Sequence, residues 1–324
     1  MDRILDTLSD YAVSLSYEKL PEGVIHQVKQ RLIDTMGCAM GSYNEIPPRI
    51  ARAHALEATA TPGATVLGSR HKSVTEHAAF ANAVMARYFD FNDKSEARKG
   101  GHPSDNMLPV LAAAEYAGAD IHTAIAAIVL AYEVQERVGD ACSHMIDTGW
   151  DYVLYVALAS AAGAGLVFGL NKEQMANALA LAVVPNAGTH ETREGQLSMW
   201  KGCAAANAAR NGVFAAMMAR RGLTGPEAAF EGACGFNKQF GISLDLPKLG
   251  GRNAPYAILQ GRFKAYPCDF EAQCCVTPMV ALHKKLKDRL DDVVRIEVES
   301  YQHTVQCAAD SRDKWNPTTR ETAD

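Results

Sequence analysis

Apolar residues recur at helical spacing along most of the chain, from the first residue to about residue 235. In segment 20–42 they form one stripe, which follows Pro21, a residue suited to the first turn of a helix. Segments 120–141 and 171–184 repeat the pattern, and each opens with an Asp or Asn of the capping type. The stripe of the first segment consists of Val24, Ile25, Val28, Leu32, Ile33 and Met36.

Runs of small apolar residues predict two further helices. The run 157–170 is apolar throughout, which predicts a buried helix. The Ala-rich run 198–222 predicts a long helix that ends at Gly222 and lies close to its neighbours. One short strand is expected in this part of the chain, at ATVLG (64–68). Because strands do not alternate with helices and no GxGxxG or Walker-type phosphate loop is present, we exclude a doubly wound nucleotide-binding fold.

The pattern changes after residue 235. Pro and Gly interrupt residues 243–262, a helix is predicted at about 277–289, and VVRIEVES (293–300) alternates as a half-buried strand does. We therefore predict a mainly α fold, with a large all-helical domain over 1–264 and a smaller, incomplete α+β lid domain over 265–324. The hydrophilic ending KWNPTTRETAD brings no closing element, so we expect the C-terminal part to be cut short.

Composition narrows the class of protein. The 324 residues are 48% hydrophobic and 21% charged, as in a globular protein, and the net charge of −5 is spread without a Lys/Arg block. The N-terminus is acidic and unlike a signal peptide, and the longest apolar run is shorter than the roughly 20 residues that span a bilayer. We predict a cytoplasmic protein with no nucleic-acid partner and no membrane partner.

The cysteines do not have the spacing of metal ligands. No C-x-x-C pair occurs, and two of the eight are adjacent. Cysteines scattered through apolar helices usually pack as small hydrophobic residues in a reducing compartment. We therefore expect neither a metal nor an organic cofactor. The cysteines are Cys38, Cys142, Cys203, Cys234, Cys268, Cys274, Cys275 and Cys307.

The polar segment YFDFNDKSEARKGGHPSDN (88–106) lies between two apolar stretches. It carries Asp90 and His102 among alternating aromatic and polar residues, and Ser104 is a plausible N-cap of the helix that follows. Because helix N-termini attract carboxylates, the segment suits proton transfer on an acidic substrate. The alternative is a capped loop whose Asp and Asn side chains satisfy their own backbone.

Two more polar segments are candidates. THETREGQLSMWKG (189–202) holds His190, Arg193 and Glu194 and ends with Lys201, which is either a surface lysine or a cation for a carboxylate or an enolate. In GRFKAYPCDFEAQ (261–273), Lys264 lies at the predicted domain junction, where clefts are common. An exposed charge is the alternative there.

Four segments resemble the MmgE/PrpD family in the family's order. They are DFNDKSEARKGGHPSDN, GLNKEQMANALALAV, KAYPC and the long run SMWKGCAAANAARNGVFAAMMARRGLTGPEAAFEGACGF. The family includes 2-methylcitrate dehydratases, cis-aconitate decarboxylase and iminodisuccinate epimerase. The resemblance covers essentially the whole chain. It implies a helical domain with an α+β lid, a site between them, and a homodimer, to which the Ala/Gly-rich helices would also be suited.

By the same resemblance, Asp90, His102 and Lys201 match catalytic positions, and Lys264 matches a substrate-binding lysine. This chain departs from the family in two places. Lys94 stands where dehydratases often carry Thr, and Asp151 and Tyr152 stand where family members have a site histidine. We include Lys94, Ser104, Asp151 and Tyr152 among the expected substrate-binding residues, and the departures put 2-methylcitrate itself in doubt as the substrate.

The resemblance thus implies a cofactor-independent lyase of the 2-methylcitrate dehydratase type, acting on a small di- or tricarboxylate. One residue removes a proton alpha to a carboxylate, and cations stabilise the enolate-like intermediate. Decarboxylation and epimerisation use the same carbanion, so both stay open. A non-catalytic relative that keeps the fold is the alternative of another class.

Overall fold

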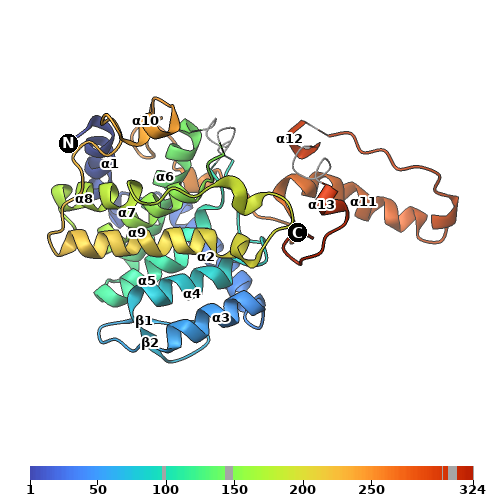
Figure 1. Cartoon of the computed structure of the whole chain (residues 1–324), viewed down its shortest axis with the longest axis horizontal. Helices are drawn as coiled ribbons and strands as arrows, with labels where there is room; N and C mark the ends of the chain where they lie inside the picture. The colour runs from blue at the N-terminus through green and yellow to red at the C-terminus, as the bar shows by residue number, and fades with distance from the viewer. Residues whose placement is uncertain (97–99, 143–148, 301, 306–311, 324) are drawn as a thin grey trace.

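The computed structural model describes residues 1–96, 100–142, 149–300, 302–305 and 312–323. Most of them form one helical body, from which the C-terminal part projects (Figure 1). The longer helices of the body are α1 (Arg3–Ser14), α2 (Glu22–Gly41), α3 (Ile46–Leu56), α4 (Thr75–Arg87), α5 (Met107–Ala117), α6 (Ile121–Ala141), α7 (Val153–Val167), α8 (Lys172–Val183) and α9 (Ala204–Arg220). Shorter elements are η1 (Tyr17–Lys19), η2 (Pro103–Asn106), η4 (His190–Arg193), η5 (Met199–Gly202), α10 (Phe236–Phe240) and η6 (Ala257–Leu259).

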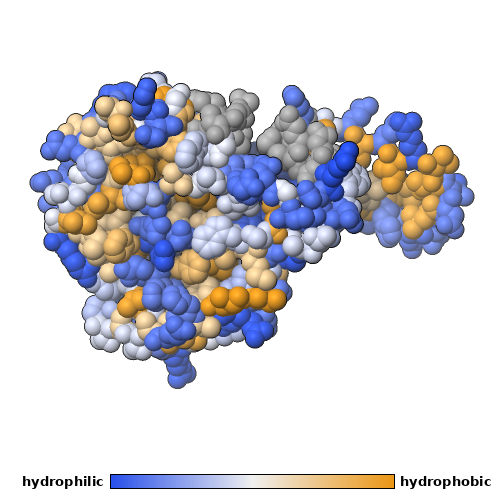
Figure 2. Space-filling model, in the orientation of Figure 1, coloured by the Kyte–Doolittle hydropathy of each residue, from blue (hydrophilic) through white to orange (hydrophobic). Residues whose placement is uncertain are grey.

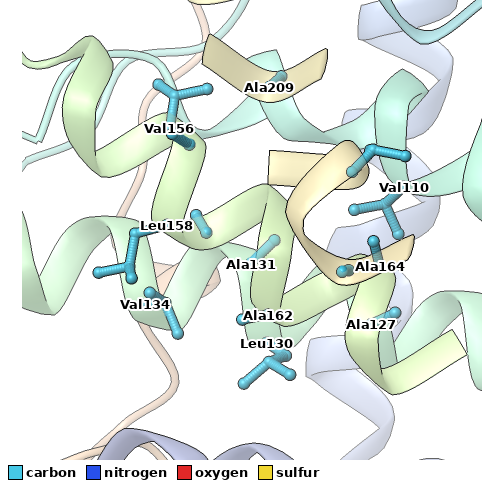
Figure 3. Close-up of a cluster of buried hydrophobic side chains, with 14 of the residues drawn as sticks. Val110, Ala127, Leu130, Ala131, Val134, Val156, Leu158, Ala162, Ala164 and Ala209 are labelled. Atoms are coloured by element: carbon cyan, nitrogen blue, oxygen red, sulfur yellow. The ribbon is translucent and has the colours of Figure 1, made fainter. Parts of the chain in front are cut away.

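Helix α7 forms the centre of the body. It is buried along nearly its whole length and packs against α6, α8 and α9. Figure 3 shows small and branched side chains that fill the space between α7 and the helices α5, α6 and α9. The residues labelled there are Val110, Ala127, Leu130, Ala131, Val134, Val156, Leu158, Ala162, Ala164 and Ala209. The buried helix predicted at 157–170 is therefore confirmed, with a start four residues earlier.

The sequence signals for helix ends hold at several positions. Asp120 caps α6 by accepting from the N–H of Thr123, and Asn171 forms a capping box with Gln174. The expected strand at 64–68 is β1 (Ala64–Thr65), which pairs with β2 (Lys72–Ser73) in an antiparallel sheet. Within the described part of the chain these two strands form the only sheet, so the mainly α prediction is confirmed.

Helix α2 turns a different face inward from the one predicted. Val24 and Val28 are buried as expected, but Ile33 is 74% exposed, and Arg31 and Thr35 are fully buried instead. A guanidinium is buried only when its N–H groups are paired, and Arg31 finds an acidic partner inside the protein. That partner rotates the buried face of the helix away from the purely apolar stripe.

The projecting C-terminal part carries η7 (Phe270–Ala272), α11 (Gln273–Leu286), η8 (Leu290–Asp292), α12 (Gln302–Thr304) and α13 (Arg312–Trp315). The strand predicted at 293–300 is wrong. These residues form no strand, and Val294 and Ile296 are 98% and 62% exposed. An alternating segment becomes a strand only beside a hydrogen-bonded neighbour, and no described segment pairs with this one. Figure 2 shows the hydrophobic side chains that this part exposes.

Residues 316–323 return to the helical body. The hydroxyl of Thr319 donates to the carbonyl oxygen of Leu197 at 2.7 Å, and the N–H of Leu197 donates to the hydroxyl of Thr322 at 2.7 Å. A guanidinium N–H of Arg320 donates to the carbonyl oxygen of Tyr88 at 3.0 Å. The segment therefore contacts the stretches that carry two of the candidate residues, Asp90 and Lys201. Among the described residues, no helix is both long and apolar enough to cross a membrane.

Backbone contact between α7 and α9 gives a test of the packing. A Cβ atom at Gly212 would lie 2.2 Å from the carbonyl oxygen of Ala157 and 2.8 Å from the amide nitrogen of Ala161. We expect Gly212→Ala to lower the free energy of unfolding by about 1–3 kcal/mol, because backbone atoms cannot move aside. Urea unfolding would measure this change.

The control is Gly37→Ala on α2, where an added Cβ meets nothing within 4 Å. This substitution should raise the free energy of unfolding by about 0.5–1 kcal/mol, the usual gain when Ala replaces Gly inside a helix. Equal effects of the two substitutions would contradict the close approach of α7 and α9.

Candidate active site

The carboxylate of Asp90 lies among four cationic or titratable side chains. Its Oδ1 is 2.5 Å from Nη1 of Arg87, 2.9 Å from Nζ of Lys264 and 3.5 Å from Nε2 of His102. Its Oδ2 is 3.3 Å from Nζ of Lys201. The structure thus brings Asp90, His102, Lys201 and Lys264 together from distant segments, and it adds Arg87, which the sequence analysis missed.

Three of these residues lie in or directly beside helical elements. Arg87 is the last residue of α4, and His102 directly precedes η2. Lys201 lies in η5, which leads into α9. Asp90 has a φ of +50°, a conformation that is costly for a residue with a side chain. This left-handed conformation aims the carboxylate of Asp90 at the cations. The ion pairs that result stabilise the conformation.

Asp93 fixes the orientation of the His102 ring. Its carboxylate accepts from Nη1 of Arg31 at 2.5 Å, from the Tyr132 hydroxyl at 2.8 Å and from the N–H of Ser104 at 3.0 Å. Its carbonyl oxygen lies 2.7 Å from Nδ1 of His102. Since a carbonyl oxygen only accepts, we assign the ring proton to Nδ1. In the neutral ring Nε2 then has a free lone pair and faces Asp90.

The protonation states follow from burial and from the neighbouring charges. Burial, reinforced by Arg87, holds the pKa of His102 well below its usual value, so the ring is neutral near pH 7. Burial alone would raise the pKa of Asp90, but Arg87, Lys264 and Lys201 outweigh it and hold that pKa well below its usual value. The site therefore holds an anionic Asp90 beside a neutral imidazole.

Lys264 and Lys94 are both engaged through short-range contacts. The ammonium of Lys264 donates to the carbonyl oxygen and Oδ1 of Asp90 and to the carbonyl oxygen of Cys268. The backbone of Lys94 exchanges two hydrogen bonds with Arg262, at 2.8 and 2.7 Å, and burial lowers the pKa of its ammonium. The expected substrate-binding roles of both lysines stay predictions.

Ser104 is not an N-cap, which corrects the sequence analysis. It lies inside η2, and α5 begins only at Met107. The fixed φ of Pro103 favours a tight turn that starts before Ser104, and Asp93 accepts from the N–H of Ser104. The Ser104 hydroxyl accepts from Nδ2 of Asn92 at 2.8 Å.

Of the two residues that replace the expected histidine, only Tyr152 reaches the Asp90 cluster. Its hydroxyl donates to Oδ2 of Asp105 at 3.0 Å and accepts from Nε of Arg87 at 3.4 Å. Its ring centroid lies 5.8 Å from that of His102. Asp151 instead forms an ion pair with Arg193 at 3.1 Å.

Several residues of the site gave no clear signal in the sequence. Arg87 lies three residues before Asp90, but a basic residue in the last turn of a helix usually faces solvent. Asp105 and Tyr132 are buried in the same network. Asp105 accepts a hydrogen bond from the Tyr152 hydroxyl, and the Tyr132 hydroxyl donates one to Asp93. Across the described ranges, no group of His, Cys, Asp and Glu side chains has the arrangement of a metal site. The expected absence of a cofactor stays a prediction.

Glu136 on α6 is a second buried acid beside this network. One of its oxygens, Oε2, accepts from the hydroxyl of Ser95 at 2.7 Å, and Oε1 has no hydrogen-bond partner within the described residues. Burial raises the pKa of Glu136 to about 8. Its carboxyl group is therefore mostly protonated at neutral pH.

The raised pKa of Glu136 predicts a pH-dependent stability. The folded state binds the proton more tightly than the unfolded state, so the free energy of unfolding falls as pH rises from about 4.5 to about 8. Glu136→Gln mimics the protonated acid and removes this loss. Relative to the wild type, we expect the variant to gain on the order of a few kcal/mol on going from pH 5 to pH 8.5. Urea unfolding of both proteins at the two pH values measures this gain. If the variant and the wild type differ in stability by the same amount at both pH values, the raised pKa is contradicted.

Comparison with known proteins shows the family of the chain and several similar proteins. The model of the MmgE/PrpD N-terminal domain matches residues 6–246. The 2-methylcitrate dehydratase of Escherichia coli K12 is 26% identical over 343 aligned positions, which cover 99% of this chain and 69% of that protein. The 2-methylcitrate dehydratase of Cupriavidus necator is 28% identical, covering 88% of this chain and 61% of the relative.

A more distant similarity is to the alkylcitrate dehydratase phiI of a fungal species, at 28% identity over 61% of this chain and 42% of that protein. The family match runs from within α1 through α10 and includes Arg87, Asp90, His102 and Lys201. From this match over residues 6–246, the chain belongs to the MmgE/PrpD family.

Proposed function

We propose that this chain is a hydro-lyase of the 2-methylcitrate dehydratase type, which removes water from a small di- or tricarboxylate without a cofactor. One observation carries the proposal. A neutral imidazole, His102, points its free Nε2 into a buried cluster that contains the cations Arg87, Lys201 and Lys264. The names of the similar dehydratases support the choice of substrate class.

In the proposed reaction, Nε2 of His102 takes the proton from the carbon alpha to a substrate carboxylate. The electron pair of that C–H bond forms the carbon–carbon double bond, and the bond from the neighbouring carbon to its hydroxyl oxygen breaks. The imidazolium of His102 returns the proton to the departing hydroxyl, which leaves as water. His102 is then neutral again, so the step needs no external acid.

The cations serve the charge that develops during this step. Proton removal places negative charge on the substrate carboxylate, and Lys201 and Arg87 are fixed nearby in a buried site, where such interactions are stronger than in water. We assign Lys264 chiefly to holding Asp90, because its contacts are to Asp90 and to the carbonyl oxygen of Cys268. Asp90 in turn stabilises the imidazolium that forms on His102.

His102→Asn tests the assignment. The Asn side chain keeps an N–H that can donate to the carbonyl oxygen of Asp93, but it lacks the lone pair of Nε2. We expect turnover to fall about 10²- to 10⁴-fold, the usual cost of a lost acid–base group, with a much smaller effect on binding. Release of water from 2-methylcitrate and citrate, and proton exchange into these acids in heavy water, measure turnover.

His26→Asn, at an exposed position on α2, is the control and should leave both measurements unchanged. Turnover of the His102 variant within a few-fold of the wild type would refute the base assignment. Loss of carbon dioxide or inversion without loss of water would favour decarboxylation or epimerisation on the same carbanion. A wild type that neither exchanges protons nor is thermally stabilised by any of these acids would be a non-catalytic relative.

A further inference from the structure

Arg193 lies beside the site in η4, within the polar run 189–202. Its Nε is 3.2 Å from Oδ1 and 3.1 Å from Oδ2 of Asp151. Its Cζ lies 4.8 Å from the centroid of the Tyr152 ring. A carboxylate and an aromatic ring therefore fix the guanidinium in one position.

The ion pair leaves part of the guanidinium unused. Nη2 of Arg193 is buried, and the described residues offer it no hydrogen-bond partner. Paired guanidinium and carboxylate groups commonly use two parallel N–H···O bonds, whereas here Nε alone reaches the oxygens of Asp151. A buried donor of a charged group without an acceptor is costly, so it calls for a functional explanation.

Tyr152 connects this donor to the proposed base. The ring of Tyr152 contacts the guanidinium of Arg193, and its centroid is 5.8 Å from that of His102. The loop reaches Tyr152 closely because residue 101 is glycine with a φ of +66°, where a Cβ would lie 2.1 Å from the ring. Tyr152 thus contacts both the guanidinium of Arg193 and the imidazole of His102.

We propose that Nη2 of Arg193 binds one carboxylate of the substrate, and that Asp151 is the positioning residue that holds Arg193 for this contact. The inference rests on the proposed function and narrows it. In the proposed function Lys201 and Arg87 stabilise the carboxylate next to the reacting carbon. A second carboxylate bound by Arg193 would make the site select polycarboxylates over acids that lack it. Because the guanidinium of Arg193 is planar, its binding also depends on the orientation of the substrate carboxylate.

Calorimetric titration of the full chain with three acids tests this selection. Tricarballylate is the reference; glutarate lacks only its central carboxylate, and methylsuccinate lacks only one terminal carboxylate. The wild type should bind tricarballylate more tightly than at least one of the other two. Arg193→Gln should weaken tricarballylate binding about 10- to 100-fold and should abolish its advantage over the acid that lacks the recognised carboxylate.

Two further variants separate recognition from folding. Arg193→Lys keeps a cation for Asp151 but loses the forked donors, so it should show the same selective loss even where Arg193→Gln folds poorly. Asp151→Asn leaves the guanidinium in place but unanchored, and it should lose part of the same selectivity. Arg252→Gln is the matched control, because Arg252 pairs with Asp10 at 3.0 Å and lies 5.3 Å from the Tyr11 ring, away from the Asp90 cluster. It should change no affinity.

The outcomes distinguish a failure of this inference from a failure of the proposed function. If Arg193→Gln and Arg193→Lys bind tricarballylate as the wild type does, the inference fails and the proposed function stands. Equal weakening for all three acids would make Arg193 a structural residue and would also overturn the inference. If the wild type binds none of the three acids, the polycarboxylate substrate class fails, and the inference fails with it.

Discussion

The buried ion pair of Arg31 and Asp93 is the constraint on which the site depends. Arg31 also donates to the carbonyl oxygens of Ile258 and Gly261, at 3.2 and 2.7 Å, so it ties the segment leading to Lys264 to the loop that carries Asp93. Through its carbonyl oxygen, Asp93 then sets the proton position on His102. Loss of one partner of such a pair typically costs about 3–5 kcal/mol, because the other charge is left buried alone. The orientation of the His102 ring and the place of Lys264 therefore have one common support.

The charges in the buried cluster around Asp90 are unequal in number. One carboxylate faces Arg87, Lys201 and Lys264, and a second acid, Asp105, lies 3.8 Å from Arg87. Cations outnumber anions here, which leaves the cluster suited to an incoming anion. The strained backbone of Asp90 fits the same picture, since strain of this kind persists only where the surroundings over-determine it.

The sequence predicts the helices, their capping residues and the polar loop, because each of these depends on the local spacing of residues. Asp120, Asn171 and the buried run around α7 behave as their neighbours along the chain dictate. The failures concern contacts that local spacing along the chain does not specify. The inward face of α2 depends on Asp93, the segment 293–300 has no described neighbour to pair with, and the role of Arg87 depends on how the chain turns after α4. The family motifs pointed to the four candidate residues Asp90, His102, Lys201 and Lys264, but they gave no signal for Arg87.

The contacts of residues 316–323 have a consequence for biosynthesis. Thr319 and Thr322 bind the backbone of Leu197, from which they are separated by 122 and 125 residues. At translation rates of 5–20 residues per second, this gap corresponds to a delay on the order of ten seconds. During that time the nascent helical body exposes the N–H of Leu197 and the carbonyl oxygen of Tyr88 to solvent or to chaperones. The stretches that carry Asp90 and Lys201 therefore gain these contacts only after residues 319–322 have been made.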